Sequence, residues 1–216
     1  MKGEDEMNRI ITISREFGSG GREIGRRLAE KMGIAYYDHE IIRELMNRTE
    51  FAEEYIRHMD EKAPISLLPI TTARTFGASA NYALEQNLKF YRQESQVIRD
   101  FAEKSDCIIV GRCADYVLHD MKPVRLFIFA DMESKMARCR RKGKDAEGLN
   151  DKELRQKIVS VDKRRARYYK FFADQIWGDK GNCELCINTS SFVEIKDIIP
   201  GLESMISSYI RQMKNN

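Results

Sequence analysis

Short apolar runs alternate along this chain with longer stretches in which apolar residues recur at helical spacing. The runs predict five short β-strands, at residues 9–13, 34–37, 107–110, 124–130 and 185–187. The runs at 107–110 and 124–130 do not alternate with polar residues, which is typical of strands covered on both faces in a parallel sheet. The strand pattern therefore indicates a buried, parallel sheet.

Helices are predicted between these strands. The first follows a polar, glycine-rich turn at 14–21 and keeps helical spacing up to Met32, with Gly33 at the position of a C-cap. Asp131 is the expected N-cap of a later helix, and Pro200 starts or kinks the last one. The further helical patterns cover residues 39–60, 81–104, 132–142, 151–175 and 193–213.

Strands that alternate with helices indicate the α/β class. We expect a three-layer, doubly wound parallel sheet of about five strands, with helical excursions near 40–104 and 143–175. Residues 61–80 carry two prolines and a polar run, and are interpreted as a connection within the first excursion. The length of 216 residues fits a single domain, 1–216.

Composition narrows the class of protein. Hydrophobic residues make up 42% and charged residues 33% of the chain, so we expect a folded, soluble protein. No apolar run approaches the ~18 residues that span a bilayer, and the acidic N-terminus does not resemble a signal peptide, which predicts a cytoplasmic protein. Five scattered cysteines are expected to stay reduced, and the spacing of Cys183 and Cys186 is interpreted as part of a strand.

Charge is distributed unevenly. The net charge is +3, but residues 138–170 hold 13 Lys or Arg against 5 Asp or Glu, so the rest of the chain is net negative. Such a segment is either a solvated helix face or a surface that binds a polyanion. The modest charge of the whole chain disfavours a nucleic-acid partner.

The turn after the first strand carries the clearest chemistry. Gly18, Gly20 and Gly21 allow backbone amides to converge at the start of a helix, which favours phosphate binding over a simple connecting turn. Gly21 occupies the position of the Walker A lysine, so Arg15 and Arg22 are the cations that could replace it. The loop residues expected to bind the phosphates are Gly18, Ser19, Gly20, Gly21 and Arg22. A dinucleotide site that would use Gly18, Gly20 and Asp38 is less favoured, because Glu23 stands at the third glycine position.

Four segments together resemble the cytidylate kinase-like branch of the P-loop nucleoside monophosphate kinases: 11–24 (ITISREFGSGGREI), 36–38 (YYD), 108–115 (IIVGRCAD) and 162–169 (DKRRARYY). The resemblance implies a P-loop core at about 8–38, 105–142 and 176–216. It also implies an acceptor-binding insertion at about 39–104 and a lid at about 143–175. ATP and Mg²⁺ are the implied cofactors.

The resemblance also implies roles for single residues. Arg112 and Asp38 match positions beside the acceptor nucleotide, and Arg92 and Gln96 are weaker acceptor candidates. Val110 and Cys113 stand where cytidylate kinases have aspartates, so the metal ligand remains unassigned, with Asp38 and Asp115 as replacements.

In the lid, helical spacing favours Arg164 and Arg167 as a pair that contacts the transferring phosphoryl group. Arg165 is expected to hold Asp162 instead. With Arg22 and Arg15, this pair makes up the expected catalytic cations.

The leading hypothesis is ATP-dependent phosphoryl transfer to a nucleoside monophosphate, CMP or dCMP, with small-molecule nucleotides as partners. Positioning and charge neutralisation dominate this chemistry, so a glycine loop, several arginines and a lid are a sufficient set. A kinase for another small acceptor and a non-catalytic nucleotide sensor remain as alternatives. The oligomeric state is not indicated by the sequence.

Overall fold

The computed structural model describes residues 8–49, 77–143 and 146–214. Its centre is a five-stranded sheet in the order β2-β3-β1-β4-β5, and every neighbouring pair is parallel. This confirms the predicted α/β class and the parallel sheet. The strands are β1 (Ile10–Arg15), β2 (Ala35–Tyr37), β3 (Cys107–Val110), β4 (Val124–Phe129) and β5 (Leu185–Asn188).

Strand β1 occupies the middle of the sheet, with Ile13 in register with Val110 of β3 on one side and Leu126 of β4 on the other. Its apolar residues are fully covered, as the absence of polar alternation in its neighbours requires. The loop that follows β1 therefore starts from the most constrained strand and lies at the carboxyl edge of the sheet, where open α/β sheets bind ligands.

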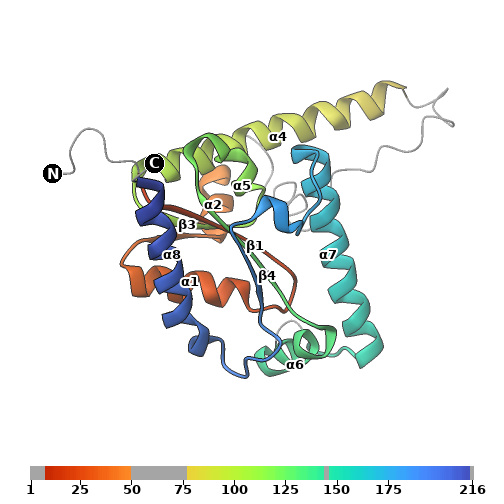
Figure 1. Cartoon of the computed structure of the whole chain (residues 1–216). Helices are drawn as coiled ribbons and strands as arrows, with labels where there is room; N and C mark the ends of the chain where they lie inside the picture. Colours follow the sequence, from red (N-terminus) through yellow and green to blue (C-terminus); the bar gives the residue numbers. More distant parts are fainter. Residues whose placement is uncertain (1–7, 50–76, 144–145, 215–216) are drawn as a thin grey trace.

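Helices cover both faces of the sheet (Figure 1). Helices α1 (Gly21–Met32) and α8 (Ile199–Lys214) pack on one face around Ile11 and Ile108. On the other face, α2 (His39–Arg48), α4 (Gly77–Lys104) and α5 (Ala114–Val117) surround Ile109. The two cores and the sheet between them form the three predicted layers.

The described helix ends follow the predicted signals. Gly33 adopts φ 64° and its amide donates to Ala29 O, while the Asp131 carboxylate accepts from the Ser134 amide at the start of α6 (Met132–Lys142). The predicted helix at 193–213 begins later, at Ile199, with Pro200 in its first turn, because residues 195–198 form a 3-10 turn first.

The remaining differences lie after β1, after β3 and at the insertion. The predicted turn at 14–21 starts late, since β1 continues through Arg15, and the short helix α5 was not predicted. Of the predicted helix at 39–60, residues 50–60 lie outside the described part, as do residues 61–76 of the predicted connection at 61–80.

Helix α7 (Asp151–Ala173) lies along one side of the sheet (Figure 1). It starts with a capping box, in which Asn150 and Glu153 satisfy each other's backbone amides. No helix among residues 8–49, 77–143 and 146–214 is both long and apolar enough to cross a membrane.

The central sheet supplies a direct test of the core. Ile109 of β3 is fully buried, so Ile109→Ala is expected to lower the free energy of unfolding by about 2–5 kcal/mol through lost burial and a residual cavity. Val193→Ala is the control, because Val193 is 75% exposed and its truncation should change stability by about 0.5 kcal/mol or less. Urea denaturation of both variants measures the difference, and equal losses would contradict this description of the core.

Candidate functional site

The loop between β1 and α1 is held by hydrogen bonds from β4 and from Thr189, which follows β5. The Glu16 amide donates to Ile128 O at 2.9 Å, and the Thr189 hydroxyl donates to Ser19 O at 2.7 Å. Gly18 and Gly20 adopt φ values of 76° and 88°, a region that side chains rarely tolerate. Ser19 is fully buried and its hydroxyl donates to Glu16 O, so its part in the loop is internal.

Helix α1 begins at this loop without a side-chain cap. Gly20 is the N-cap residue and offers no side chain to accept from the first turn. The amides at the start of a helix lack intrahelical acceptors and carry the positive end of the helix dipole. An anion at the loop would therefore meet backbone donors, which supports the predicted phosphate-binding role of Gly18, Gly20 and Gly21.

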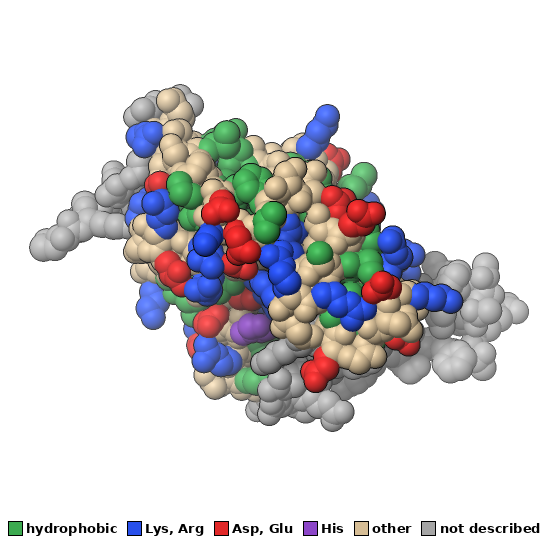
Figure 2. Space-filling model, turned by 90° about the horizontal axis from the view of Figure 1, so that it is seen from below, with side chains coloured by type: hydrophobic (Ala, Val, Ile, Leu, Met, Phe, Trp, Pro, Cys, Tyr) green, Lys and Arg blue, Asp and Glu red, His purple; other side chains and the backbone are tan. Residues whose placement is uncertain are grey.

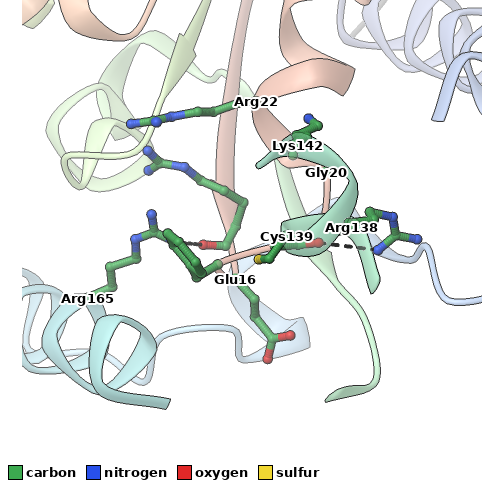
Figure 3. Close-up of a pocket in the computed structure, with 11 residues that line it drawn as sticks. Glu16, Gly20, Arg22, Arg138, Cys139, Lys142 and Arg165 are labelled. Atoms are coloured by element: carbon green, nitrogen blue, oxygen red, sulfur yellow. Dashed lines mark hydrogen bonds between the residues drawn. The ribbon is translucent and has the colours of Figure 1, made fainter. Parts of the chain in front are cut away.

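A pocket opens at this loop (Figure 3). Side chains from α1, α6 and α7 complete its wall. In Figure 3, Arg22 and Arg165 extend toward the same side of the loop, whereas Arg138 extends the opposite way. The residues that line the pocket are Arg15, Glu16, Phe17, Gly18, Gly20, Gly21, Arg22, Arg138, Cys139, Lys142 and Arg165.

Arg15 and Arg22 both bind Asp38, which follows β2. Arg22 Nε lies 2.8 Å from Asp38 Oδ2, and Arg15 Nη2 lies 3.6 Å from Asp38 Oδ1. From the sequence, the two arginines were expected to bind the phosphates of the nucleotide donor, and Asp38 was expected to lie beside the acceptor nucleotide. The structure instead joins them in one cluster, because the carboxyl end of β2 and the loop after β1 open at the same edge of the sheet.

Arg165 of α7 adds a third guanidinium to this cluster. Its Nη1 donates to Arg15 O at 2.9 Å. Burial, together with the positive charges of Arg15 and Arg22, lowers the pKa of Arg165 to about 9, which leaves it protonated at neutral pH. Arg165 thus joins Arg15 and Arg22 at the loop, and an incoming anion would relieve the mutual repulsion of the three guanidinium groups.

The lid residues chosen from the sequence lie elsewhere. Arg164 donates to Ser160 on its own helix, Arg167 is exposed, and neither lines the pocket. Arg165 does form the expected ion pair with Asp162, at 3.8 Å, but it also reaches the loop. The roles of Arg164 and Arg167 therefore stay a prediction, but the face of α7 that meets the loop is that of Arg165, because helical spacing shows which residues share a face and not which face meets the loop.

A buried lysine ties the loop to α6 and α7. Lys135 Nζ lies 2.6 Å from Glu16 Oε2 and 3.1 Å from Asp162 Oδ2, and its side chain is 7% exposed. Asp162 also accepts from the Phe17 amide at 2.7 Å. Burial opposes protonation of Lys135, but Glu16 and Asp162 outweigh it and raise its pKa. Burial raises the pKa of Asp162, against the opposing effect of the Phe17 amide and Lys135.

No role was predicted for Lys135 or Glu16 from the sequence. Glu16 places a carboxylate in a loop that is otherwise suited to binding anions. Such a carboxylate requires a nearby cation, and this requirement was the available signal. Lys135 lies just before the cationic segment in sequence and gave no signal of its own.

The acceptor candidates separate into two groups. Arg112 lies directly after Gly111, whose backbone packs against the Arg15 guanidinium, so Arg112 is beside the cluster. Arg92 and Gln96 are exposed on α4, and Gln96 donates to Asp100 of the same helix at 2.8 Å. The structure does not bring Arg92 and Gln96 to the pocket, because they lie on the solvent side of the helix.

A magnesium site would need oxygen ligands at the pocket. No group of three or more His, Cys, Asp or Glu that could hold a metal occurs in the described part of the chain. Mg²⁺ commonly uses one or two carboxylates and completes its shell with water and substrate phosphates. Glu16 fits that use as a carboxylate in the pocket wall, whereas Asp115 is buried on α5 and accepts from Tyr169.

Several cations of the segment at 138–170 pair with acidic side chains. Arg140 pairs with Asp151, Arg141 with Glu194, and Lys142 with Glu23. On the face seen in Figure 2, acidic side chains lie among the basic ones. These pairs favour the interpretation of the segment as structural helix surface over that of a polyanion-binding surface.

Comparison with known proteins places the chain among P-loop kinases. A model of the cytidylate kinase-like family matches residues 10–191. No curated protein sequence matches the chain. A crystal structure of an uncharacterized protein from Eubacterium ventriosum ATCC 27560 is similar at 26% identity and a TM-score of 0.63, with 94% of this chain and 99% of that chain covered.

Two shikimate kinases share the fold. The enzyme from Bacteroides thetaiotaomicron is 16% identical with a TM-score of 0.55, and covers 94% of this chain and 99% of its own. The enzyme from Acinetobacter baumannii, solved in complex with shikimate, is 17% identical with a TM-score of 0.50, and covers 95% and 96%. At this level of identity the likeness concerns the fold alone.

The buried lysine gives a prediction for stability. Lys135→Met leaves two carboxylates close together without their cation and should lower the free energy of unfolding by about 3–5 kcal/mol at neutral pH. Lys142→Met, at an ion pair whose lysine is 54% exposed, should cost about 1 kcal/mol or less.

The same variant should show a characteristic pH dependence. The raised pKa of Asp162 should rise further without Lys135, so the folded variant binds a proton more tightly than its unfolded state. The deficit relative to the wild type should therefore be smallest below about pH 4, the ordinary aspartate range, and grow toward neutral pH. Urea denaturation across pH measures it, and a deficit independent of pH would contradict the assigned ion pairs.

Proposed function

The chain belongs to the cytidylate kinase-like family, and from this premise we propose that it transfers the γ-phosphoryl group of ATP to a nucleoside monophosphate, CMP or dCMP. The family and the shared fold support a nucleotide-dependent kinase. The observation that carries the proposal is the gathering of Arg15, Arg22 and Arg165 beside a glycine-rich loop at the uncapped start of α1.

In this proposal the loop binds the donor phosphates. Backbone amides at Gly18, Gly20 and Gly21 donate to phosphate oxygens, with the dipole of α1 behind them. Arg22 and Arg15 supply the positive charge that a Walker lysine supplies elsewhere. Bound Mg²⁺ would neutralise charge on the phosphates, and Glu16 is the residue of the pocket wall that would hold it.

The transferring phosphoryl group then lies between donor and acceptor. Little covalent work is asked of the protein, because positioning and charge stabilisation dominate phosphoryl transfer. Arg165 reaches this place from α7, so closure of the proposed lid at 143–175 would complete the cluster and exclude water. Asp38 keeps the guanidinium groups of Arg15 and Arg22 oriented toward the acceptor side.

The acceptor is proposed to bind between the core and the insertion at 39–104. Arg112 is the candidate for its phosphate or base, because it directly follows Gly111, whose backbone packs against the Arg15 guanidinium. A second acceptor class has support from Asp38, a buried carboxylate at the edge of the cluster that could accept a hydrogen bond from a hydroxyl group. A small hydroxylated acceptor, as in the two shikimate kinases of the same fold, is therefore the alternative.

A turnover panel distinguishes these acceptors. ADP release should be measured with ATP, Mg²⁺ and, in turn, CMP, dCMP, UMP, AMP, GMP and shikimate. Preferred turnover of CMP or dCMP supports the proposal, and preference for shikimate supports the hydroxylated class. Tight ATP binding without turnover of any acceptor would indicate a nucleotide sensor and contradict the proposed reaction.

The lid gives a second test. Arg165→Ala should lower kcat by about 10²-fold, because it removes a charge that faces the transferring group. Arg164→Ala and Arg167→Ala are matched controls on the same helix and should retain activity within about threefold, since neither side chain lines the pocket. Losses confined to Arg164 or Arg167 would place the functional face of α7 on the other side.

A further inference from the structure

A buried carboxylate connects the acceptor side of the molecule to α7. Glu94 of α4 is 1% exposed, and its Oε1 accepts from Arg112 Nη1 at 2.5 Å. Its other oxygen accepts from the hydroxyl of Tyr168. The three side chains come from α4, from the segment after β3 and from α7, so a single carboxylate connects three parts of the fold.

The backbone at Arg112 is held in an unusual conformation. Gly111, Arg112 and Cys113 all lie in the left-handed region, with φ values of 83°, 57° and 52°. A Cβ at Gly111 would lie 1.9 Å from Arg15 Nη1, so the cationic cluster fixes this turn from one side. Residues other than glycine cost about 1–2 kcal/mol each in the left-handed conformation, and they persist in it only where surrounding contacts hold the backbone. Glu94 provides such a contact from the other side, through its ion pair with Arg112.

Tyr168 is held by packing as well as by its hydrogen bond. Its ring packs against Phe172, which stacks on Tyr91 of α4 at a centroid distance of 4.0 Å. Burial and the nearby Glu94 carboxylate raise the pKa of Tyr168 well above its ordinary value, so the hydroxyl stays protonated and donates. One and two turns earlier, the same helix binds the loop through Arg165 and Asp162.

A buried ion pair is a costly way to join α4 to the turn after β3. Removing two charges from water carries a desolvation penalty that the pair barely recovers, and apolar residues of similar size usually stabilise as well or better. Such a pair is better explained by the orientation that it imposes than by its contribution to stability. In this case the oriented group is the guanidinium of Arg112, the residue that follows Gly111 at the cationic cluster.

We propose that Glu94 is a positioning residue of the acceptor site, which orients Arg112, and that the Tyr168 hydroxyl makes this orientation depend on the position of α7. The inference rests on the proposed function and extends it. The position of Arg165 at the loop is then coupled to the position of Arg112 at the acceptor, because α7 carries Arg165 and also contacts Glu94 through Tyr168. Acceptor affinity is therefore sensitive to a hydroxyl group on the lid helix.

The matched test compares Tyr168→Phe with Tyr169→Phe. Both variants delete one hydroxyl from α7 that donates to a buried carboxylate, Glu94 in the first case and Asp115 in the second. Tyr168→Phe should raise the KM for CMP about tenfold and leave the Kd of ATP, measured by calorimetry without CMP, within about twofold. Tyr169→Phe should lower the Tm but leave the KM for CMP within about twofold.

Glu94→Gln provides the second variant, should Tyr168→Phe fold poorly. It keeps the shape of the side chain, removes the charge and should also raise the KM for CMP about tenfold or more. In the double variant the two effects should overlap and fall short of multiplying, since both act on Arg112.

The outcomes separate the inference from the proposed function. Wild-type protein that phosphorylates no nucleoside monophosphate contradicts the proposed function and the inference with it. Wild-type turnover of CMP, together with an equal KM for CMP in Tyr168→Phe and Tyr169→Phe, overturns the inference alone. Effects of Tyr168→Phe and Glu94→Gln that multiply independently also overturn it.

Discussion

The ammonium group of Lys135 is the contact on which the geometry of the site depends. From α6 it binds Glu16 of the loop and Asp162 of α7, and all three groups are largely shielded from solvent. A charge in such a place must have its partners, so the loop and both helices are fixed relative to one another. Asp162 in turn positions the loop and Arg165, because it accepts from the Phe17 amide and pairs with Arg165. The shape of the phosphate loop is therefore a tertiary property and not only a matter of its glycines.

The arginine cluster follows from that placement. Arg15, at the end of β1, and Arg22, in the first turn of α1, meet at Asp38, and Arg165 reaches them from α7, which Asp162 and Lys135 hold beside the loop. The three cations repel one another, and Asp38 and Asp162 compensate them only in part, because Asp162 also pairs with Lys135. Such a cluster is preorganised for negative charge before any ligand arrives, which is the condition under which electrostatic stabilisation is most effective.

The helices and strands were easier to predict from the sequence than the side chains that contact one another in the candidate site. Unbroken apolar runs such as that of β3 identify buried parallel strands, and Gly33 and Asp131 mark helix ends through local chemistry that needs no tertiary information. The glycine-rich loop was recognised for the same reason. The spacing that favoured Arg164 and Arg167 could not show that Arg165 contacts the loop, because the face of α7 that meets the loop is decided by residues about 145 positions away. The burial of Glu94 and Lys135 was not predicted. A single charged residue in an amphipathic helix gives the same sequence pattern whether its side chain faces solvent or a buried partner.

The contacts between α7 and the loop join residues that are far apart in the sequence, and this separation matters during synthesis of the chain. Asp162 contacts Phe17 across 145 residues of chain, and Arg165 contacts Arg15 across 150. Chains emerge from the ribosome with the N-terminus first, at roughly 5–20 residues per second. The loop is thus synthesised many seconds before the helix that fixes it, and a nascent chain that ends before residue 162 has four of the five strands but lacks Asp162 and Arg165. In the proposed function, nucleotide binding is therefore acquired late in biosynthesis, after most of the hydrophobic core has already been translated.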